Sequence, residues 1–258
     1  MTNLTKHHSQ NSHTPKKIDI FYKTYPEDEE WLDYSIKSVY KYSSNFRQIV
    51  IVSNRGHNYR PPAGNIPVKY IEIDLPPDNP GYPHGVGYWW QMATKLTWHL
   101  YTDADAIVSV DSDQIFFDYF SPASWHKDDK IIWLRRPWSE SGRGIIWKQG
   151  ADYLLGKPTQ YDYMVSSGFY ISRSAIKLFN QYLLDKFSQT PTQYYMDLKH
   201  PRTSEYVPIG AFIDMINHKD YKFYNYKELN GKPWPLKQFR SWDKISKETR
   251  EKLEEIIK

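Results

Sequence analysis

The chain has 258 residues, of which 40% are hydrophobic and 25% are charged, and its formal net charge is +4. These values are typical of one globular domain, and no stretch approaches the ~20 consecutive apolar residues that span a bilayer. There are no cysteines, which excludes disulfides, thiolate zinc sites and cysteine nucleophiles, and a cytoplasmic location is the default expectation.

Residues 1–17 are polar and carry several Lys and His side chains, without the apolar segment of a signal peptide. We expect this stretch to be a disordered tail, and residues 18–258 to form a single domain. Aromatic residues make up 17% of the chain, a density that can supply flat surfaces for sugars or bases as well as a core.

The first half of the domain alternates strand-like and helix-like segments. Short apolar runs at residues 18–25, 48–52 and 68–74 predict strands, while residues 28–44 and 88–101 carry apolar side chains at helical spacing. This order predicts an open α/β sheet flanked by helices.

The second half contains further candidates for both kinds of element. Strands are predicted at residues 130–134, 163–172 and 222–226, and helices at residues 174–187 and 246–258.

Two segments of the second half contain residues that break regular structure. Pro208 and Gly210 interrupt an apolar-periodic segment at residues 207–216. Residues 229–242 are rich in Pro, Trp, Lys and Arg, which predicts an ordered loop. Its part around residues 234–242 is a candidate lid, and the alternative is that it only packs on the core.

The motif Asp111-Ser112-Asp113 follows an apolar run at residues 106–110 that predicts a buried strand. Side chains two residues apart point to the same side of a strand, so the two carboxylates converge if strand geometry continues through the motif. Paired carboxylates suit Mg²⁺ or Mn²⁺, which also take ligands from water and phosphate. The alternative is that both aspartates are polar residues at the exit of a strand.

Further candidates lie at the ends of other strands. Tyr25 and Asn54 follow the first two strands, where base and ribose contacts arise in open sheets, although turn-forming residues are common there too. His84 belongs to the Pro- and Gly-rich segment 75–87, whose backbone could approach a bound ligand closely.

A segment after the Asp motif interleaves cations with aromatic side chains, beginning with Arg135, Arg136 and Trp138. Such a surface is a candidate for acceptor binding, and for nucleic acid it would supply phosphate contacts and base stacking. The alternative is a solvated face with a few buried tryptophans.

The order of these features resembles the GT-A fold of nucleotide-sugar glycosyltransferases over about residues 18–226. Asp111-Ser112-Asp113 is similar to the metal-binding DxD of that family, and residues 166–173 to its glycine-containing acceptor-side strand. Ser204-Glu205-Tyr206 lies where many of these enzymes carry an acidic residue that opens a helix. The resemblance implies a Rossmann-like mixed sheet flanked by helices, with a nucleotide-binding half at about 18–117 and an acceptor-binding half at about 118–258.

The resemblance also implies roles for individual residues. Asp113 would be the main ligand of Mn²⁺ or Mg²⁺, Asp111 would contact the metal or the ribose, and Gly168 would lie on the acceptor side. Glu205 is the first candidate for the general base of an inverting transfer, with Asp214 as the second. In a retaining transfer neither needs to act as a base, and Glu205 could instead be a carboxylate that stabilises a helix start.

One feature departs from the family pattern. Many GT-A enzymes complete the metal site with a histidine after the last core strand, and no histidine follows His218 in this chain. Asp243, or Lys237 and Arg240 in direct contact with the diphosphate, are the candidates that would replace it.

The sequence therefore predicts a metal-dependent transfer of a sugar from a nucleotide to the hydroxyl of a glycan or small molecule. A hydroxymethylated base in DNA is a further acceptor candidate. The alternatives are a nucleotidyltransferase, whose Gly-rich basic phosphate loop is missing at residues 23–28, and a non-catalytic carbohydrate- or nucleic-acid-binding module.

Overall fold

The computed structural model describes residues 17–77, 81, 85–197, 199–229, 235–239 and 244–258. The tail expected at residues 1–17 lies outside this part of the chain except for Lys17. No helix among the described residues is long and apolar enough to cross a membrane.

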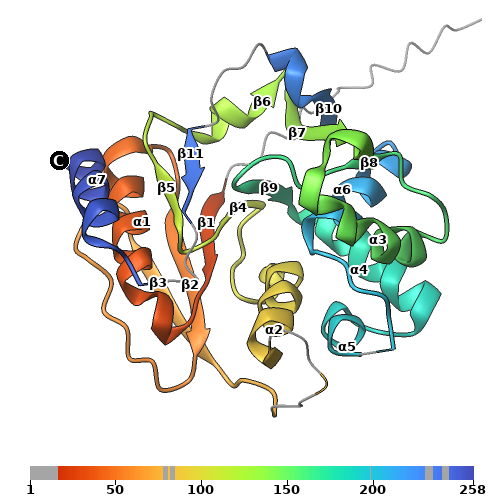
Figure 1. The fold of residues 1–258 in the computed structure, drawn as a ribbon, viewed down its shortest axis with the longest axis horizontal. Helices are drawn as coiled ribbons and strands as arrows, with labels where there is room; N and C mark the ends of the chain where they lie inside the picture. Colours follow the sequence, from red (N-terminus) through yellow and green to blue (C-terminus); the bar gives the residue numbers. More distant parts are fainter. Residues whose placement is uncertain (1–16, 78–80, 82–84, 198, 230–234, 240–243) are drawn as a thin grey trace, which may run out of the picture.

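A five-stranded sheet of order β3-β2-β1-β4-β9 forms the centre of the molecule (Figure 1). The first four strands run parallel, and β9 is antiparallel to β4, so the mixed, mostly parallel α/β sheet that the sequence predicts is confirmed. The strands are β1 (Ile18–Lys23), β2 (Gln48–Asn54), β3 (Val68–Ile73), β4 (Ala106–Val110) and β9 (Phe169–Ser172).

The strands β1 and β4 are adjacent at the middle of this sheet and are buried along their whole length. Most of their side chains are apolar, which is what a strand covered on both faces requires, and the exceptions are Asp19, Lys23 and Ser109. From β1 the chain builds outward through β2 to β3, and it then crosses to the other side of β1 to form β4. This reversal opens a crevice at the carboxyl ends of β1 and β4, the usual place for a ligand in an open α/β sheet.

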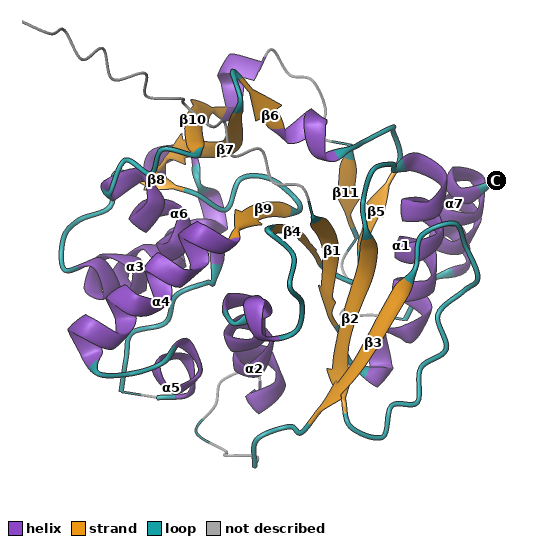
Figure 2. Cartoon of the chain, turned by 180° about the vertical axis from the view of Figure 1, so that it is seen from behind, coloured by secondary structure: helices purple, strands orange, loops and turns teal. Residues whose placement is uncertain are grey.

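Helices flank the sheet in two groups. Figures 1 and 2 show α1 (Glu29–Tyr42) and α7 (Lys247–Ile257) together beside β1 to β3, where Trp31 and Tyr34 pack in one cluster with Leu253. The other helices lie toward β9 and are α2 (Gly85–Leu96), α3 (Lys148–Leu155), α4 (Arg173–Phe187), α5 (Pro191–Met196) and α6 (Tyr206–Met215).

Smaller sheets complete the fold. The strands β10 (Tyr221–Asn225), β7 (Lys130–Pro137) and β6 (His126–Lys127) form one, with β8 (Tyr161–Asp162) paired to β7, while β11 (Leu236–Gln238) pairs with β5 (Gln114–Phe116). Short 3-10 helices lie at Pro26–Asp28, Trp98–Leu100, Pro122–Trp125, Trp138–Glu140, Gly142–Trp147 and Tyr226–Leu229.

The break expected at Pro208 and Gly210 is wrong, because α6 runs through both residues. Pro208 lies in the first turn of the helix, where its missing N–H has no intrahelical acceptor to lose. Gly210 allows close packing, since a Cβ there would lie 2.6 Å from the Cβ of Tyr163.

Two other boundaries also differ from the prediction. The strand expected over residues 163–172 begins only at Phe169, after Gly168 with its positive φ of 75°. The loop expected over residues 229–242 contains the strand β11, which pairs with β5.

The buried carboxylate of Asp19 ties the amino ends of the central strands together. It accepts hydrogen bonds from the Arg47 guanidinium at 2.8 and 2.7 Å, from Gln48 Nε2 at 2.9 Å and from Thr102 Oγ1 at 2.5 Å. Arg47 and Gln48 come from the start of β2, and Thr102 precedes β4. A buried charge of this kind stabilises the fold only while its partners are present.

Arg47→Met should therefore lower the free energy of unfolding by about 3 kcal/mol, because it leaves Asp19 buried without its cation. The exposed pair of Arg55 and Asp74 provides the control, and Arg55→Met should lower the free energy of unfolding far less than Arg47→Met does. Urea unfolding of both variants measures the difference, and equal losses would contradict the role given to Asp19.

Candidate functional site

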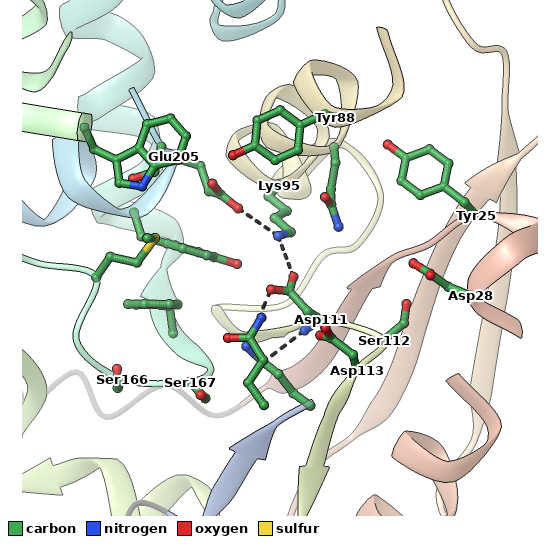
Figure 3. A pocket seen from close by; sticks show the side chains of 18 of the residues that line it. Tyr25, Asp28, Tyr88, Lys95, Asp111, Ser112, Asp113, Ser166, Ser167 and Glu205 are labelled. Carbon is green, nitrogen blue, oxygen red and sulfur yellow. Dashed lines mark hydrogen bonds and ion pairs between the residues drawn. The ribbon is translucent and has the colours of Figure 1, made fainter. Parts of the chain in front are cut away.

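A pocket of about 610 Å³ lies where the carboxyl ends of β1 and β4 meet (Figure 3). Tyr25 and Asp28, which follow β1, form one side, and Ser166 and Ser167, which precede β9, lie on the other. The pocket therefore occupies the crevice that the strand order creates.

The Asp-x-Asp motif forms a turn between β4 and β5. The strand β4 ends at Val110, and the turn is closed by Gln114, whose N–H donates to the Asp111 carbonyl at 3.0 Å. Gln114 Oε1 also accepts from the Asp111 N–H at 3.1 Å. The strand geometry that the sequence argument required is therefore not present, but the turn still brings Asp111 and Asp113 to one pocket.

Hydroxyl and backbone contacts hold this turn in place. Ser112 Oγ donates to Thr24 Oγ1 at 2.9 Å, which joins the ends of β4 and β1. The carbonyl of Asp113 accepts from the Phe239 N–H at 2.8 Å, next to β11. The turn is thus anchored to the segment that the sequence marked as a candidate lid.

Lys95 is the residue of this site that the sequence argument missed. Its Nζ donates to Asp111 Oδ1 at 2.6 Å and to Glu205 Oε1 at 2.7 Å, and its side chain is only 3% exposed. Burial opposes the charged form, but the neighbouring carboxylates of Asp111 and Glu205 outweigh it and hold the pKa of Lys95 well above its usual value. The side chain is therefore an ammonium ion at neutral pH.

A signal for Lys95 was present in the sequence. It lies on α2 between Met92 and Leu96, which are both buried, so a lysine interrupts an apolar helical face. A charged residue in that position is almost never fully buried unless it is paired.

Glu205 directly precedes α6, as the resemblance implied. Its side chain makes no capping hydrogen bond to the helix, and its Oε1 accepts from Lys95 instead. The carboxylate is therefore turned to the pocket rather than to the start of its own helix.

The pocket carries an excess of negative charge. Its lining includes four carboxylates, Asp28, Asp111, Asp113 and Glu205, against the single ammonium of Lys95, so the formal sum is −3 when all are ionised. Burial, and then the charge of Asp111, raises the pKa of Asp28 from 3.8 to about 6. An anionic ligand needs a further cation here to offset this charge.

The carboxylates of Asp111 and Asp113 fit a divalent ion of the Mg²⁺ or Mn²⁺ type. Such ions are held by one or two carboxylates, and water and substrate phosphates supply the other ligands. The described part of the chain contains no group of three or more His, Cys, Asp or Glu side chains that could hold a metal by itself. The donor set therefore fits an ion that shares its coordination with a substrate.

Tyr25 and Asn54, predicted to contact the donor, are linked through a buried lysine. Lys23 Nζ lies 3.9 Å from the centre of the Tyr25 ring and donates to Asn54 Oδ1 at 3.0 Å. Burial, and then the charge of Lys95, lowers the pKa of Lys23 to about 7. Tyr25 lines the pocket, whereas Asn54 is not among the lining residues.

The predicted acceptor cations are engaged outside the pocket. Arg136 pairs with the buried Asp162 at 2.9 Å, and Arg135 pairs with Asp214, the second candidate base, which also accepts from Tyr163 at 2.6 Å. Neither arginine, nor Asp214, is among the residues that line the pocket.

The remaining predicted residues are distributed as follows. Trp138 is buried, and its indole N–H donates to the Thr159 carbonyl at 3.1 Å. Gly168 lies between the pocket residues Ser167 and Phe169, whereas Lys237 is exposed on β11 beside Gln238, which lines the pocket. His84, Arg240 and Asp243 lie outside the described residues.

No known family model matches this chain, and no curated protein matches it.

Asp28→Asn should stabilise the protein, because a carboxylate whose pKa is raised on folding destabilises the folded state once it is ionised. The gain should be about 1–2 kcal/mol at about pH 8, after allowance for solvent screening of this half-buried group, and it should fall away as the pH drops from 6 toward 4. Denaturant unfolding at about pH 8 and about pH 4 measures this gain in the free energy of unfolding, and Glu27→Gln, at an exposed neighbouring residue, is the control. A gain that is the same at both pH values would contradict this account.

Proposed function

We propose that this protein is a metal-dependent glycosyltransferase that moves a sugar from a nucleotide donor to a hydroxyl acceptor. The observation that carries the proposal is the convergence of Asp111, Asp113 and Glu205 on one pocket at the reversal of the strand order. This is the arrangement that the resemblance to GT-A glycosyltransferases implies, with the motif on the donor side and the helix-opening acid across from it.

The charge of the pocket supports a donor that binds together with a divalent ion. A nucleoside diphosphate is anionic, and it would be repelled by a lining whose formal charge is −3. Asp111 and Asp113 would hold the ion, which as a Lewis acid stabilises the negative charge that develops on the leaving diphosphate. Tyr25, which follows β1 and lines the pocket, would stack with the base.

The opposite wall of the pocket suits a neutral ring that carries a hydroxyl group. It is formed by the side chains of Trp147, Met164, Phe169 and Tyr206 together with the hydroxyls of Ser166 and Ser167. Aromatic faces stack on sugars or other rings, and hydroxyls fix their orientation. Glu205 would orient the acceptor hydroxyl or, in an inverting reaction, accept its proton.

The structure favours this proposal over a nucleotidyltransferase for an electrostatic reason. A nucleoside triphosphate brings more negative charge than a diphosphate sugar, and the single ammonium among the pocket residues is already shared by two carboxylates. The DNA acceptor was suggested partly by a segment that interleaves cations with aromatic side chains, and two of these cations, Arg135 and Arg136, pair with aspartates of the same chain. A glycan or a small molecule is therefore the acceptor class we favour.

A thermal-shift panel tests the donor site directly. One nucleoside diphosphate or its sugar ester should raise the melting temperature in the presence of Mn²⁺ and do so much less when EDTA is present, because a ligand that binds only the folded state stabilises it. If the same shift is seen with and without the metal, the role of Asp111 and Asp113 as metal ligands is wrong. If no nucleotide raises the melting temperature, the result favours the alternative of a non-catalytic carbohydrate- or nucleic-acid-binding module.

Asp113→Asn should reduce sugar transfer or sugar-nucleotide hydrolysis by about a hundredfold or more, because an amide is a much weaker ligand for the ion that stabilises the leaving group. The melting temperature without ligand should change little. Asp118→Asn is the matched control, since Asp118 is an exposed aspartate of the same segment and does not line the pocket. Full turnover in the Asp113 variant would exclude this metal site.

A further inference from the structure

Lys95 lies in the middle of the candidate site and not beside it. Figure 3 shows its ammonium between the carboxylates of Asp111 and Glu205, and the two hydrogen bonds measure 2.6 and 2.7 Å. The side chain reaches this point from α2, so it joins a helix, the turn after β4 and the start of α6. The first of the two predicted metal ligands is thus already bound to a cation.

This contact determines which oxygens of Asp111 are available to a divalent ion. Asp111 Oδ1 is engaged by Lys95, and Gln114 Nε2 lies 3.5 Å from Asp111 Oδ2. An ion that binds alone must share Asp111 with the ammonium and must also approach a buried positive charge, which is unfavourable at short range.

A nucleoside diphosphate would change this balance in two ways. Its phosphate oxygens supply ligands that the protein lacks, since no described group of three carboxylates or histidines can hold an ion. Its negative charge also offsets the repulsion between the ion and Lys95.

We propose that Lys95 is a resident counter-cation that keeps the affinity of the Asp111–Asp113 site for a divalent ion low until a nucleoside diphosphate binds. The metal and the nucleotide then bind as a unit, and neither binds tightly alone. The inference rests on the donor site of the proposed function but not on sugar transfer.

A purely structural role for Lys95 predicts a different result. If the ammonium only braces α2 against α6, its loss loosens the pocket, and the affinity for a metal falls. If it competes with the metal, its loss frees Asp111 and removes a repulsive charge, and the affinity rises. The direction of the change separates the two roles.

The test is calorimetric titration of the full chain with Mn²⁺ alone. Lys95→Met keeps the length of the side chain and removes its charge, and it should tighten Mn²⁺ binding by about tenfold or more. In the unaltered protein, Mn²⁺ should bind weakly alone and at least about tenfold more tightly with a saturating nucleoside diphosphate such as UDP or GDP, and this difference should shrink in the variant. Unchanged, weaker or undetectable Mn²⁺ binding by the folded variant overturns the proposal.

Two further variants keep the test decisive if Lys95→Met does not fold. The double variant Lys95→Met with Glu205→Gln removes the ammonium together with its second carboxylate, so the net charge is unchanged, and it should still bind Mn²⁺ more tightly than the unaltered protein. Glu205→Gln alone leaves Lys95 entirely to Asp111 and should weaken Mn²⁺ binding. Either variant moving in the opposite direction overturns the proposal.

Lys148→Met is the matched control. Lys148 pairs with Asp152 on α3 and does not line the pocket, so its loss should leave the Mn²⁺ affinity unchanged. The outcomes also separate this inference from the proposed function. If the protein shows metal-dependent sugar transfer but the Lys95 variants do not bind Mn²⁺ more tightly, the inference alone is wrong. If the Lys95 variants bind Mn²⁺ more tightly but the protein has no transfer activity, the proposed glycosyltransferase function is wrong.

Discussion

The ammonium of Lys95, held between Asp111 and Glu205, is the interaction on which the pocket depends. A buried lysine without partners would lose its charge, and the buried Glu205 and partly buried Asp111 would repel each other without a cation between them. Each of the three groups is therefore stabilised in its charged form by the others. Since Lys95 and Asp111 belong to the predicted nucleotide-binding half and Glu205 to the predicted acceptor half, one ammonium joins the two predicted halves.

The two ends of β1 show how the fold accommodates such a site. At the amino end, Asp19 is buried with a full set of donors from Arg47, Gln48 and Thr102, and its charge is matched. At the carboxyl end, Lys23 is buried without a carboxylate partner among its described hydrogen bonds, and its pKa falls to about 7. Buried charged groups without an oppositely charged partner at one end of a sheet, and fully paired ones at the other, are typical of a scaffold that carries a functional site.

The sequence predicted those parts of the protein that depend on neighbouring residues in the chain. The strands β1, β2 and β4 are continuous apolar runs, and the Asp motif directly follows one of them, so its position at the sheet edge followed from connectivity. Lys95 could not be assigned in this way, because its partner Glu205 is 110 residues away. The same holds for Arg135 and Arg136, whose partners Asp214 and Asp162 become neighbours only in the folded chain.

Charge also divides the pocket into two parts with different chemistry. The side with Asp28, Asp111 and Asp113 is acidic and suits a metal-bound anion, whereas the wall with Trp147, Met164 and Phe169 contains no charged side chain among the residues described as lining it, apart from Glu205. A phosphorylated acceptor would meet a carboxylate and find no unpaired cation among the described residues that line the pocket. Under the proposed function, an uncharged ring would avoid that repulsion and gain from stacking, so the donor would be selected by its charge and the acceptor by its shape.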